Sequence, residues 1–148
     1  MTLTPLEQQL ADAMARARDA ENRRVGVRDQ RVAPLERDID LLGAGAEVAF
    51  CRLANAYPDL TSHVRAGGAD CVLADGRTVD VKATPHPAGA LLAPVGRAPH
   101  ADVYVLITGT FPTYTYRGAC PADDLHDATR LADLGHGPVY RVPQGDLQ

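Results

Sequence analysis

The sequence lacks tryptophan, contains a single lysine and has no long apolar run among its 148 residues. A transmembrane helix needs about 18 or more consecutive apolar residues, so no membrane span is expected. The first residues, MTLTPLEQQLADA, have neither a basic start nor an apolar stretch and do not resemble a signal peptide. The hydrophobic content of 45% nevertheless suits a globular protein, and the length suits one domain around one core.

Several familiar motifs are also missing. The three cysteines, Cys51, Cys71 and Cys120, are far apart and form no CxxC pair, which excludes a disulfide framework or a zinc knuckle. They are interpreted as small core residues of a protein in a reducing, cytoplasmic setting. A GxxxxGK loop and a GxSxG elbow are absent as well, so the sequence predicts neither a P-loop ATPase nor a serine hydrolase.

Charge is distributed unevenly along the chain. The net charge of −4 argues against a large nucleic-acid footprint. The N-terminal region is nevertheless rich in arginine, at positions 16, 18, 23, 24, 28, 31 and 37. Two interpretations stay open: a solvated helix face followed by a polar loop, or a basic surface that faces phosphates. In the second case Arg16, Arg23, Arg24 and Arg28 are the expected nucleic-acid contacts.

Two helices are expected in the first third of the chain. Thr4-Pro5-Leu6-Glu7 has the pattern of a capping box and predicts a helix from residue 5 to about 23. Its apolar face is expected at Leu6, Leu10, Ala13 and Ala17. Residues 25–37 contain Gly26 and Pro34 and are expected to be irregular. A second helix is predicted over 39–57, ended by Pro58.

The rest of the chain has a β pattern. The segment ADCVLADGRTVDVKAT predicts a hairpin with Asp75-Gly76 at its turn. Four prolines in 85–102 exclude a long helix there, although 91–93 suits a short strand. The remaining expected elements are strands at 102–108, 113–118 and 139–142 and a short helix that begins at 121. The chain is therefore predicted to be a single α/β (α+β) domain, with an N-terminal helical extension (1–38) and a core (39–148).

One group of charged residues on the hairpin has the composition of a catalytic site. Asp80 and Lys82 alternate along a strand and project from one face. Asp70 lies on the preceding strand, and its position depends on the turn. A two-residue loop would place Asp70 opposite Val81, whereas a three-residue loop with a left-handed Gly76 would place it opposite Asp80. Two facing carboxylates repel each other, and a divalent cation between them would remove the conflict.

Glu47 is the third acid of interest. Its neighbours one helical turn away, Gly43, Ala44, Phe50 and Cys51, are all apolar or small. A carboxylate on such a face needs a partner, because burying it alone costs several kcal/mol. The small residues would let the helix approach the sheet, so Glu47 is expected to reach a metal ion directly or through water.

Lysine is used at one position only, against fourteen arginines elsewhere in the chain. Lys82 therefore hints that a compact ammonium is needed beside Asp80. The five histidines show no metal-ligand spacing and are interpreted as surface residues, with a position near the site as the alternative for His86 and His100, which flank the proline-rich segment. Tyr114 and Tyr116 are expected to pack in the ordinary way, with stacking on bases as the alternative.

Asp70, nine intervening residues and Asp80-Val81-Lys82 together resemble the PD-(D/E)XK motif of restriction-endonuclease-like nucleases. Glu47 is similar to the acidic residue that many members carry on their first core helix. The resemblance covers residues 39–119 and implies a mixed β-sheet with helices on both sides. Two departures are visible: Ala69 stands in place of proline, and prolines occupy the segment where many members have a crossover helix.

The resemblance implies a Mg²⁺-dependent deoxyribonuclease, with Mn²⁺ as a substitute metal. Asp70, Asp80 and Glu47 would bind metal, and Lys82 would complete the catalytic group by positioning water or stabilising charge on the phosphate. An endonuclease of the repair, recombination or defence type is expected, with a phage origin, RNA as substrate and a homodimer left open. The alternative is a catalytically inactive nuclease-fold protein that acts as a binding module, adaptor or inhibitor.

Overall fold

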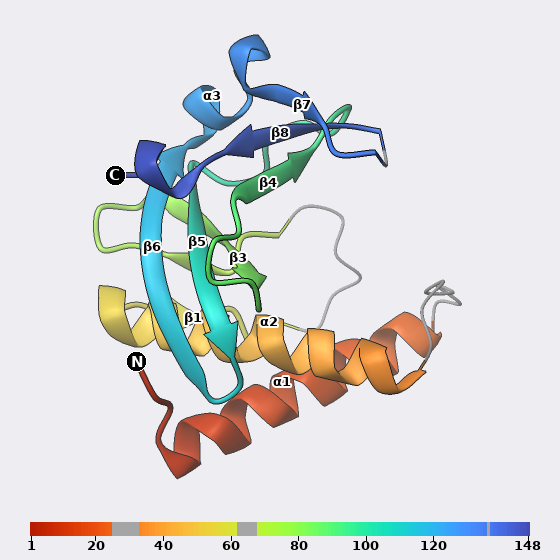
Figure 1. Ribbon diagram of the computed structural model, residues 1–148. Coiled ribbons are helices and arrows are strands. Elements are labelled where there is room, and N and C mark those ends of the chain that lie inside the picture. Colours follow the sequence, from red (N-terminus) through yellow and green to blue (C-terminus); the bar gives the residue numbers. More distant parts are fainter. Residues whose placement is uncertain (25–32, 62–67, 136) are drawn as a thin grey trace.

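The computed structural model describes residues 1–24, 33–61, 68–135 and 137–148, with side chains from Asp38 onward in the second of these ranges (Figure 1). The helices and strands in chain order are α1 (Pro5–Arg24), α2 (Ala33–Ala54), β1 (Tyr57–Pro58), β2 (Cys71–Val72), β3 (Thr78–Thr84), β4 (Leu91–Pro94), β5 (Val103–Thr110), β6 (Thr113–Pro121), α3 (Ala122–Leu125), β7 (Leu131–Asp133) and β8 (Pro138–Val142). None of the described helices is both long and apolar enough to cross a membrane.

The larger sheet is mixed and has the strand order β1-β2-β3-β5-β6. β1, β2 and β3 are antiparallel neighbours, β5 runs parallel to β3, and β6 runs antiparallel to β5. A parallel pair requires a crossover connection, and here the proline-rich segment that contains β4 provides it. The predicted α/β class with a mixed sheet is therefore confirmed.

The two faces of this sheet are covered differently. Val103, Val105 and Ile107 of β5 belong to the core that α1 and α2 cover, whereas Tyr104 and Leu106 belong to a second core. A three-stranded antiparallel sheet, β4-β8-β7, and the short helix α3 build that second core. Figure 1 shows α1 and α2 side by side on one side of the molecule and the small sheet at the opposite end. In the described part of the chain, the second face thus carries only the short helix α3 beside the small sheet, because proline between β3 and β5 excludes a long crossover helix.

The capping box of α1 is confirmed, but of its predicted buried face only Leu10 packs against the core, while Leu6, Ala13 and Ala17 are exposed. The Thr4 amide donates to Glu7 Oε2 at 2.7 Å, and the Glu7 amide donates to Thr4 Oγ1 at 3.3 Å. The buried residues of the helix are Ala11, Met14 and Ala15, while Leu6 is 75% exposed. Alanine at the contact lets α1 approach α2 closely, so tertiary packing overrode the spacing of the larger side chains.

α2 begins and ends earlier than the sequence predicts. It begins at Ala33, with Pro34 in the first turn, where proline is tolerated. The expected irregular segment is therefore wrong for 33–37, and its remainder, 25–32, lies outside the described residues. The helix ends at Ala54 because Asn55 adopts φ 51° and Ala56 N donates to Cys51 O at 2.8 Å, a Schellman cap. The expected boundary between 38 and 39 falls inside α2, and α1 contributes Met14 to the shared core.

Candidate active site

The turn of the hairpin sets the relationship between the two predicted aspartates. Leu73 N donates to Arg77 O at 2.8 Å, and Gly76 has φ 90°. The strands pair Cys71 with Val79 and Val72 with Thr78. The turn is thus the three-residue loop, and the registered pairs of the hairpin end at Cys71, one residue after Asp70.

Asp70 is buried, and the backbone of the next strand holds its carboxylate. Its Oδ2 accepts a hydrogen bond of 2.7 Å from Val81 N, and its own amide donates to Val79 O, also at 2.7 Å. The Asp70 carboxylate therefore accepts the hydrogen bond of a backbone amide that would otherwise be donated to a carbonyl of the neighbouring strand. This fixes Asp70 beside the residue that separates Asp80 from Lys82.

Asp80 lies at the centre of the candidate site and is only 5% exposed. Lys82 Nζ lies 2.6 Å from its Oδ1, and His100 Nε2 contacts its Oδ2. The ammonium gives Oδ1 a charge partner, but the pair does not meet hydrogen-bond geometry, and Oδ1 is a buried oxygen without a hydrogen bond. A buried carboxylate oxygen in this state retains the capacity to bind a cation.

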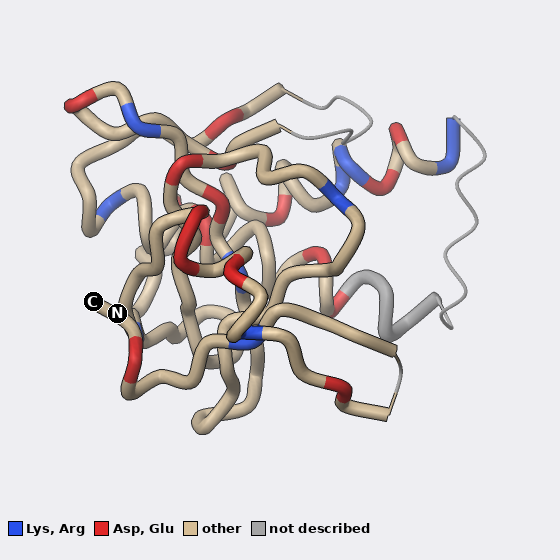
Figure 2. The backbone as a smooth tube through the Cα atoms, turned by 90° about the horizontal axis from the view of Figure 1, so that it is seen from above, with Lys and Arg blue, Asp and Glu red and all other residues tan. Residues whose placement is uncertain are grey.

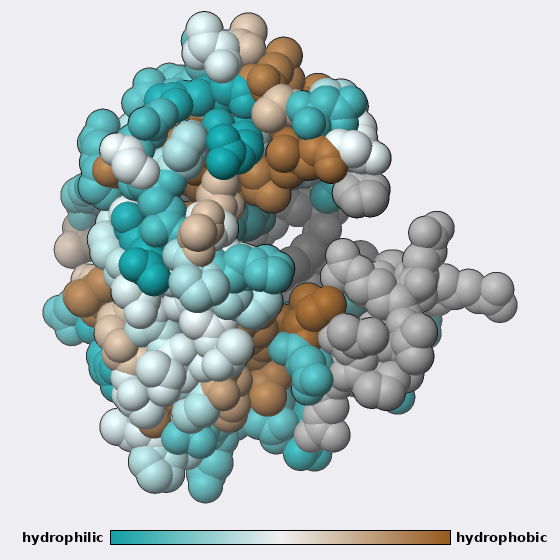
Figure 3. Space-filling view, viewed as in Figure 1, coloured by the Kyte–Doolittle hydropathy of each residue, from teal (hydrophilic) through white to brown (hydrophobic). Residues whose placement is uncertain are grey.

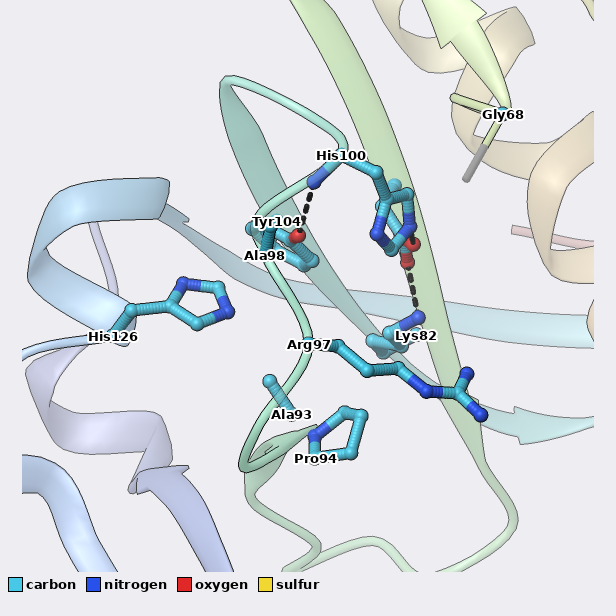
Figure 4. A pocket seen from close by; sticks show the side chains of 10 residues that line it. Gly68, Lys82, Ala93, Pro94, Arg97, Ala98, His100, Tyr104 and His126 are labelled. Carbon is cyan, nitrogen blue, oxygen red and sulfur yellow. Dashed lines mark hydrogen bonds and ion pairs between the residues drawn. The ribbon is translucent and has the colours of Figure 1, made fainter. Parts of the chain in front are cut away.

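The positions of Tyr104 and His100 follow from the pairing of β5 with β3. The register sets Tyr104 beside Asp80 and Leu106 beside Lys82. Tyr104 Oη accepts a hydrogen bond of 3.2 Å from His100 N, which holds the residue just before β5 above the site (Figure 4). The interpretation of His100 as a surface residue is therefore wrong, because its ring contacts a buried carboxylate.

A cavity of about 540 Å³ opens in front of Asp80. Figure 3 shows that this side of the molecule is hollowed between the part formed by the small sheet and the helices below it. The residues that line the cavity are Gly68, Asp80, Lys82, Ala93, Pro94, Arg97, Ala98, His100, Tyr104 and His126. Two permanent cations and two histidines surround one carboxylate in this lining, a composition that favours an anionic ligand.

Glu47 does not line this cavity and has a different partner from the one expected. Arg18 of α1 donates to both of its oxygens, at 2.8 and 2.5 Å. The carboxylate is 2% exposed, so the guanidinium provides the partner that burial demands. The sequence showed the need for a partner but not its identity, because the crossing of α1 over α2 decides which side chain arrives there.

The N-terminal arginines form no unpaired basic surface in the described part of α1. Arg16, Arg23 and Arg24 pair with Asp12, Asp19 and Glu21 on the same helix. Figure 2 shows acidic and basic residues interspersed along this helix. Arg28 lies outside the described residues. These contacts offset the charge expected to face phosphates, so the solvated helix face is the better description of α1.

The cysteines and tyrosines behave as packing residues. Cys51, Cys71 and Cys120 are buried and free, as expected of core residues. The contact with Cys71, together with burial, raises the pKa of the Cys51 thiol. Tyr114 is fully buried and Tyr116 stacks on Phe50 at 6.3 Å, so ordinary packing is confirmed for both tyrosines.

In comparisons with known proteins, no family model matches the chain, and no curated protein matches its sequence. The argument for a function therefore depends on the residues and geometry described above.

Proposed function

We propose that the protein is a Mg²⁺-dependent nuclease of the restriction-endonuclease-like type, which hydrolyses phosphodiester bonds in DNA at a site centred on Asp80 and Lys82. The observation that carries the proposal is the environment of the Asp80 Oδ1 atom. This atom is a buried carboxylate oxygen without a hydrogen bond, it lies 2.6 Å from the only lysine of the chain, and its residue lines a cavity with cationic walls.

The arrangement of the strands supports the same proposal. An antiparallel β1-β2-β3 meander leads through a crossover to β5, which is parallel to β3. The motif residues occupy neighbouring strands of this meander, Asp70 just before β2 and Asp80 and Lys82 on β3. This arrangement supports the proposal, because it keeps the three residues that resemble the PD-(D/E)XK motif on one hairpin of a mixed sheet.

The donor set fits a hard divalent cation bound by few protein ligands. Mg²⁺ is commonly held by one or two carboxylates together with substrate phosphate and water. Asp80 would hold the ion through Oδ1, with Asp70, just before β2, as the second carboxylate, and Mn²⁺ would be an acceptable substitute. Glu47 is left out of this site because Arg18 holds both of its oxygens. When bound, the ion would lower the pKa of a coordinated water and offset phosphate charge.

The side chains of the site have separate tasks in this proposal. Lys82 places a positive charge beside the reacting phosphate, where negative charge increases in the transition state. Arg97, on the exposed rim of the cavity, binds a neighbouring phosphate and orients the strand. His100 contacts Oδ2 of the Asp80 carboxylate, so Oδ1, beside Lys82, is the oxygen that would bind the cation.

Cleavage assays with the full chain test this proposal. The purified protein is incubated with supercoiled plasmid, linear single- and double-stranded DNA, and RNA, in Mg²⁺ or in EDTA. Cleavage of DNA that requires Mg²⁺ is expected, and nicking of closed circles identifies an endonuclease. Asp80→Asn and Lys82→Ala are each expected to lower kcat on the order of 100-fold or more. Asp123→Asn, at an exposed position outside the cavity, serves as the control.

Two results would count against the proposal. Cleavage that persists in both variants would mean that another site, or a contaminant, is responsible. Metal-independent binding of DNA or protein, without turnover of any substrate, would favour the inactive binding module. A clear preference for RNA would keep the site and change the substrate.

A further inference from the structure

His126 faces the cavity from the wall opposite Lys82 and His100 (Figure 4). It caps the C-terminus of α3, and its contacts come from three elements. Its ring lies edge-on to Tyr104 of β5, with centroids 5.4 Å apart, and to Tyr140 of β8, with centroids 5.1 Å apart. The ring is therefore held in place rather than free to rotate on the surface.

The hydrogen bonds of His126 determine which ring nitrogen is available. Nδ1 lies 2.8 Å from Ala122 O, and the backbone amide of His126 donates to the same carbonyl at 3.0 Å. A carbonyl oxygen only accepts hydrogen bonds, so Nδ1 must carry a hydrogen. Nε2 is the nitrogen left to exchange a proton with a ligand in the cavity.

The charged groups around the ring favour the binding of an anionic ligand next to it. Lys82, Arg97, His100 and Asp80 line the same cavity, and the two contacting rings are tyrosines. The acidic residues of α3 itself, Asp123 and Asp124, are exposed. Among the described contacts, the ring has no carboxylate partner that would hold its second nitrogen.

We infer that His126 is the general acid of the reaction and protonates the oxygen that leaves phosphorus; this inference rests on the nuclease function proposed above. In phosphoryl transfer the attacking and leaving oxygens lie roughly in line, on opposite sides of phosphorus. With the cation held by Asp80, the attacking water would approach from the wall that bears Asp80 and Lys82, and the leaving oxygen would emerge towards the wall that bears His126.

The proposed step balances as follows. The oxygen of the attacking water forms the new bond to phosphorus, and its proton passes to a second water. The bond between phosphorus and the leaving oxygen breaks, and its electron pair stays on that oxygen. This oxygen takes the proton from Nε2 of the His126 imidazolium, and solvent then reprotonates the ring.

The test compares two substrates that differ in their need for an acid. An internucleotide bond releases a basic alkoxide, whereas a p-nitrophenyl ester of thymidine phosphate releases a stable phenolate that needs no proton. His126→Asn keeps a donor for the Ala122 carbonyl but lacks Nε2. It is expected to lower kcat on DNA by about 10²–10⁴-fold and to leave turnover of the nitrophenyl ester within a few-fold of wild type. The control is His86→Gln, which changes an exposed histidine outside the cavity.

The pH dependence gives a second measurement. With DNA, kcat of the wild type should fall on the alkaline side as the acid loses its proton, and this limb should be missing in His126→Asn. Equal losses on both substrates, or a raised KM with unchanged kcat, would overturn the assignment, because His126 would then only support the fold or bind phosphate. If the wild type cleaves neither substrate, the proposed function itself fails, and the inference fails with it.

Discussion

Lys82 Nζ lies 2.6 Å from Asp80 Oδ1, yet this buried oxygen accepts no hydrogen bond within the described structure. Ten residues away along the hairpin, Asp70 is equally buried, but its Oδ2 accepts a 2.7 Å hydrogen bond from Val81 N. The two carboxylates therefore differ in what they contribute to folding. Asp70 satisfies a backbone amide, whereas the partners of the Asp80 carboxylate among the described residues are the side chains of Lys82 and His100.

The same substitution in both aspartates should separate these contributions. Asp70→Ala leaves the Val81 amide buried without an acceptor, which costs about 1–3 kcal/mol of unfolding free energy. Asp80→Ala removes the contacts of both carboxylate oxygens with Lys82 and His100, but these two side chains reach solvent, so a loss under about 1 kcal/mol is expected. Urea unfolding of the two variants and wild type measures both values. Equal losses would contradict this division.

The pair between Arg18 and Glu47 gives a second prediction. Arg18→Met leaves the Glu47 charge buried without its partner and should cost about 3–5 kcal/mol. Combining it with Glu47→Leu should recover most of this loss, because both charges are then absent. A double-mutant cycle by urea unfolding measures the coupling. Arg23→Met, which breaks an exposed pair with Asp19, is the control and should cost under about 1 kcal/mol. If the double variant is as unstable as Arg18→Met, the ion pair is not the cause.

The sequence predicted those parts of the site that depend on neighbouring residues, and missed those that depend on contacts between distant segments. The hairpin turn follows from local chemistry, because a glycine in third place suits a left-handed residue, and from it the sequence predicted Asp70 opposite Asp80. The partner of Glu47 depended instead on how two helices cross. The sequence indicated only that a carboxylate among small residues needs a partner, and Arg18 comes from a helix 29 residues away.

The histidines of the site escaped sequence reasoning for a similar reason. His100 and His126 have no ligand spacing. His100 reaches the cavity through the parallel pairing of β3 with β5, and His126 reaches it from the end of α3, packed on Tyr104 and Tyr140. The second sheet was missed because β7 is three residues long and β4 follows a run of prolines. β4 and β7 form a sheet only because each of them pairs with β8.

The glycines of α2 offer a matched test of how closely this helix packs. A Cβ on Gly45 would lie 2.1 Å from Tyr114 Oη and 2.9 Å from its Cζ, against a fully buried ring. Gly45→Ala should therefore cost about 1–3 kcal/mol by overpacking. A Cβ on Gly43 meets no atom within 4 Å, so Gly43→Ala should gain up to about 1 kcal/mol from helix propensity. Thermal and urea unfolding should give opposite signs, and a stabilising Gly45→Ala would show that Tyr114 moves away without loss.

The hydrogen bonds of Asp102 should make the free energy of unfolding depend on pH. Its Oδ2 accepts hydrogen bonds from Thr78 N at 2.8 Å and Thr78 Oγ1 at 2.7 Å, which tie the start of β5 to the start of β3. These bonds, the backbone amide first, lower the pKa of Asp102 from its ordinary value. A lowered pKa in the folded state means that the charged carboxylate stabilises the fold above the unfolded pKa, near about 3.9, and that this is lost as pH falls through the folded value.

Asp102→Asn should therefore be less stable than wild type at neutral pH, and the gap should close in acid. Once wild-type Asp102 is protonated, both proteins carry a neutral side chain that bonds Thr78 about equally well. Urea unfolding at neutral pH and at about pH 2.5, below the unfolded pKa, measures the two gaps. An unchanged gap at both values would mean that the side-chain shape, and not its charge, joins the two strands that position Tyr104 beside Asp80.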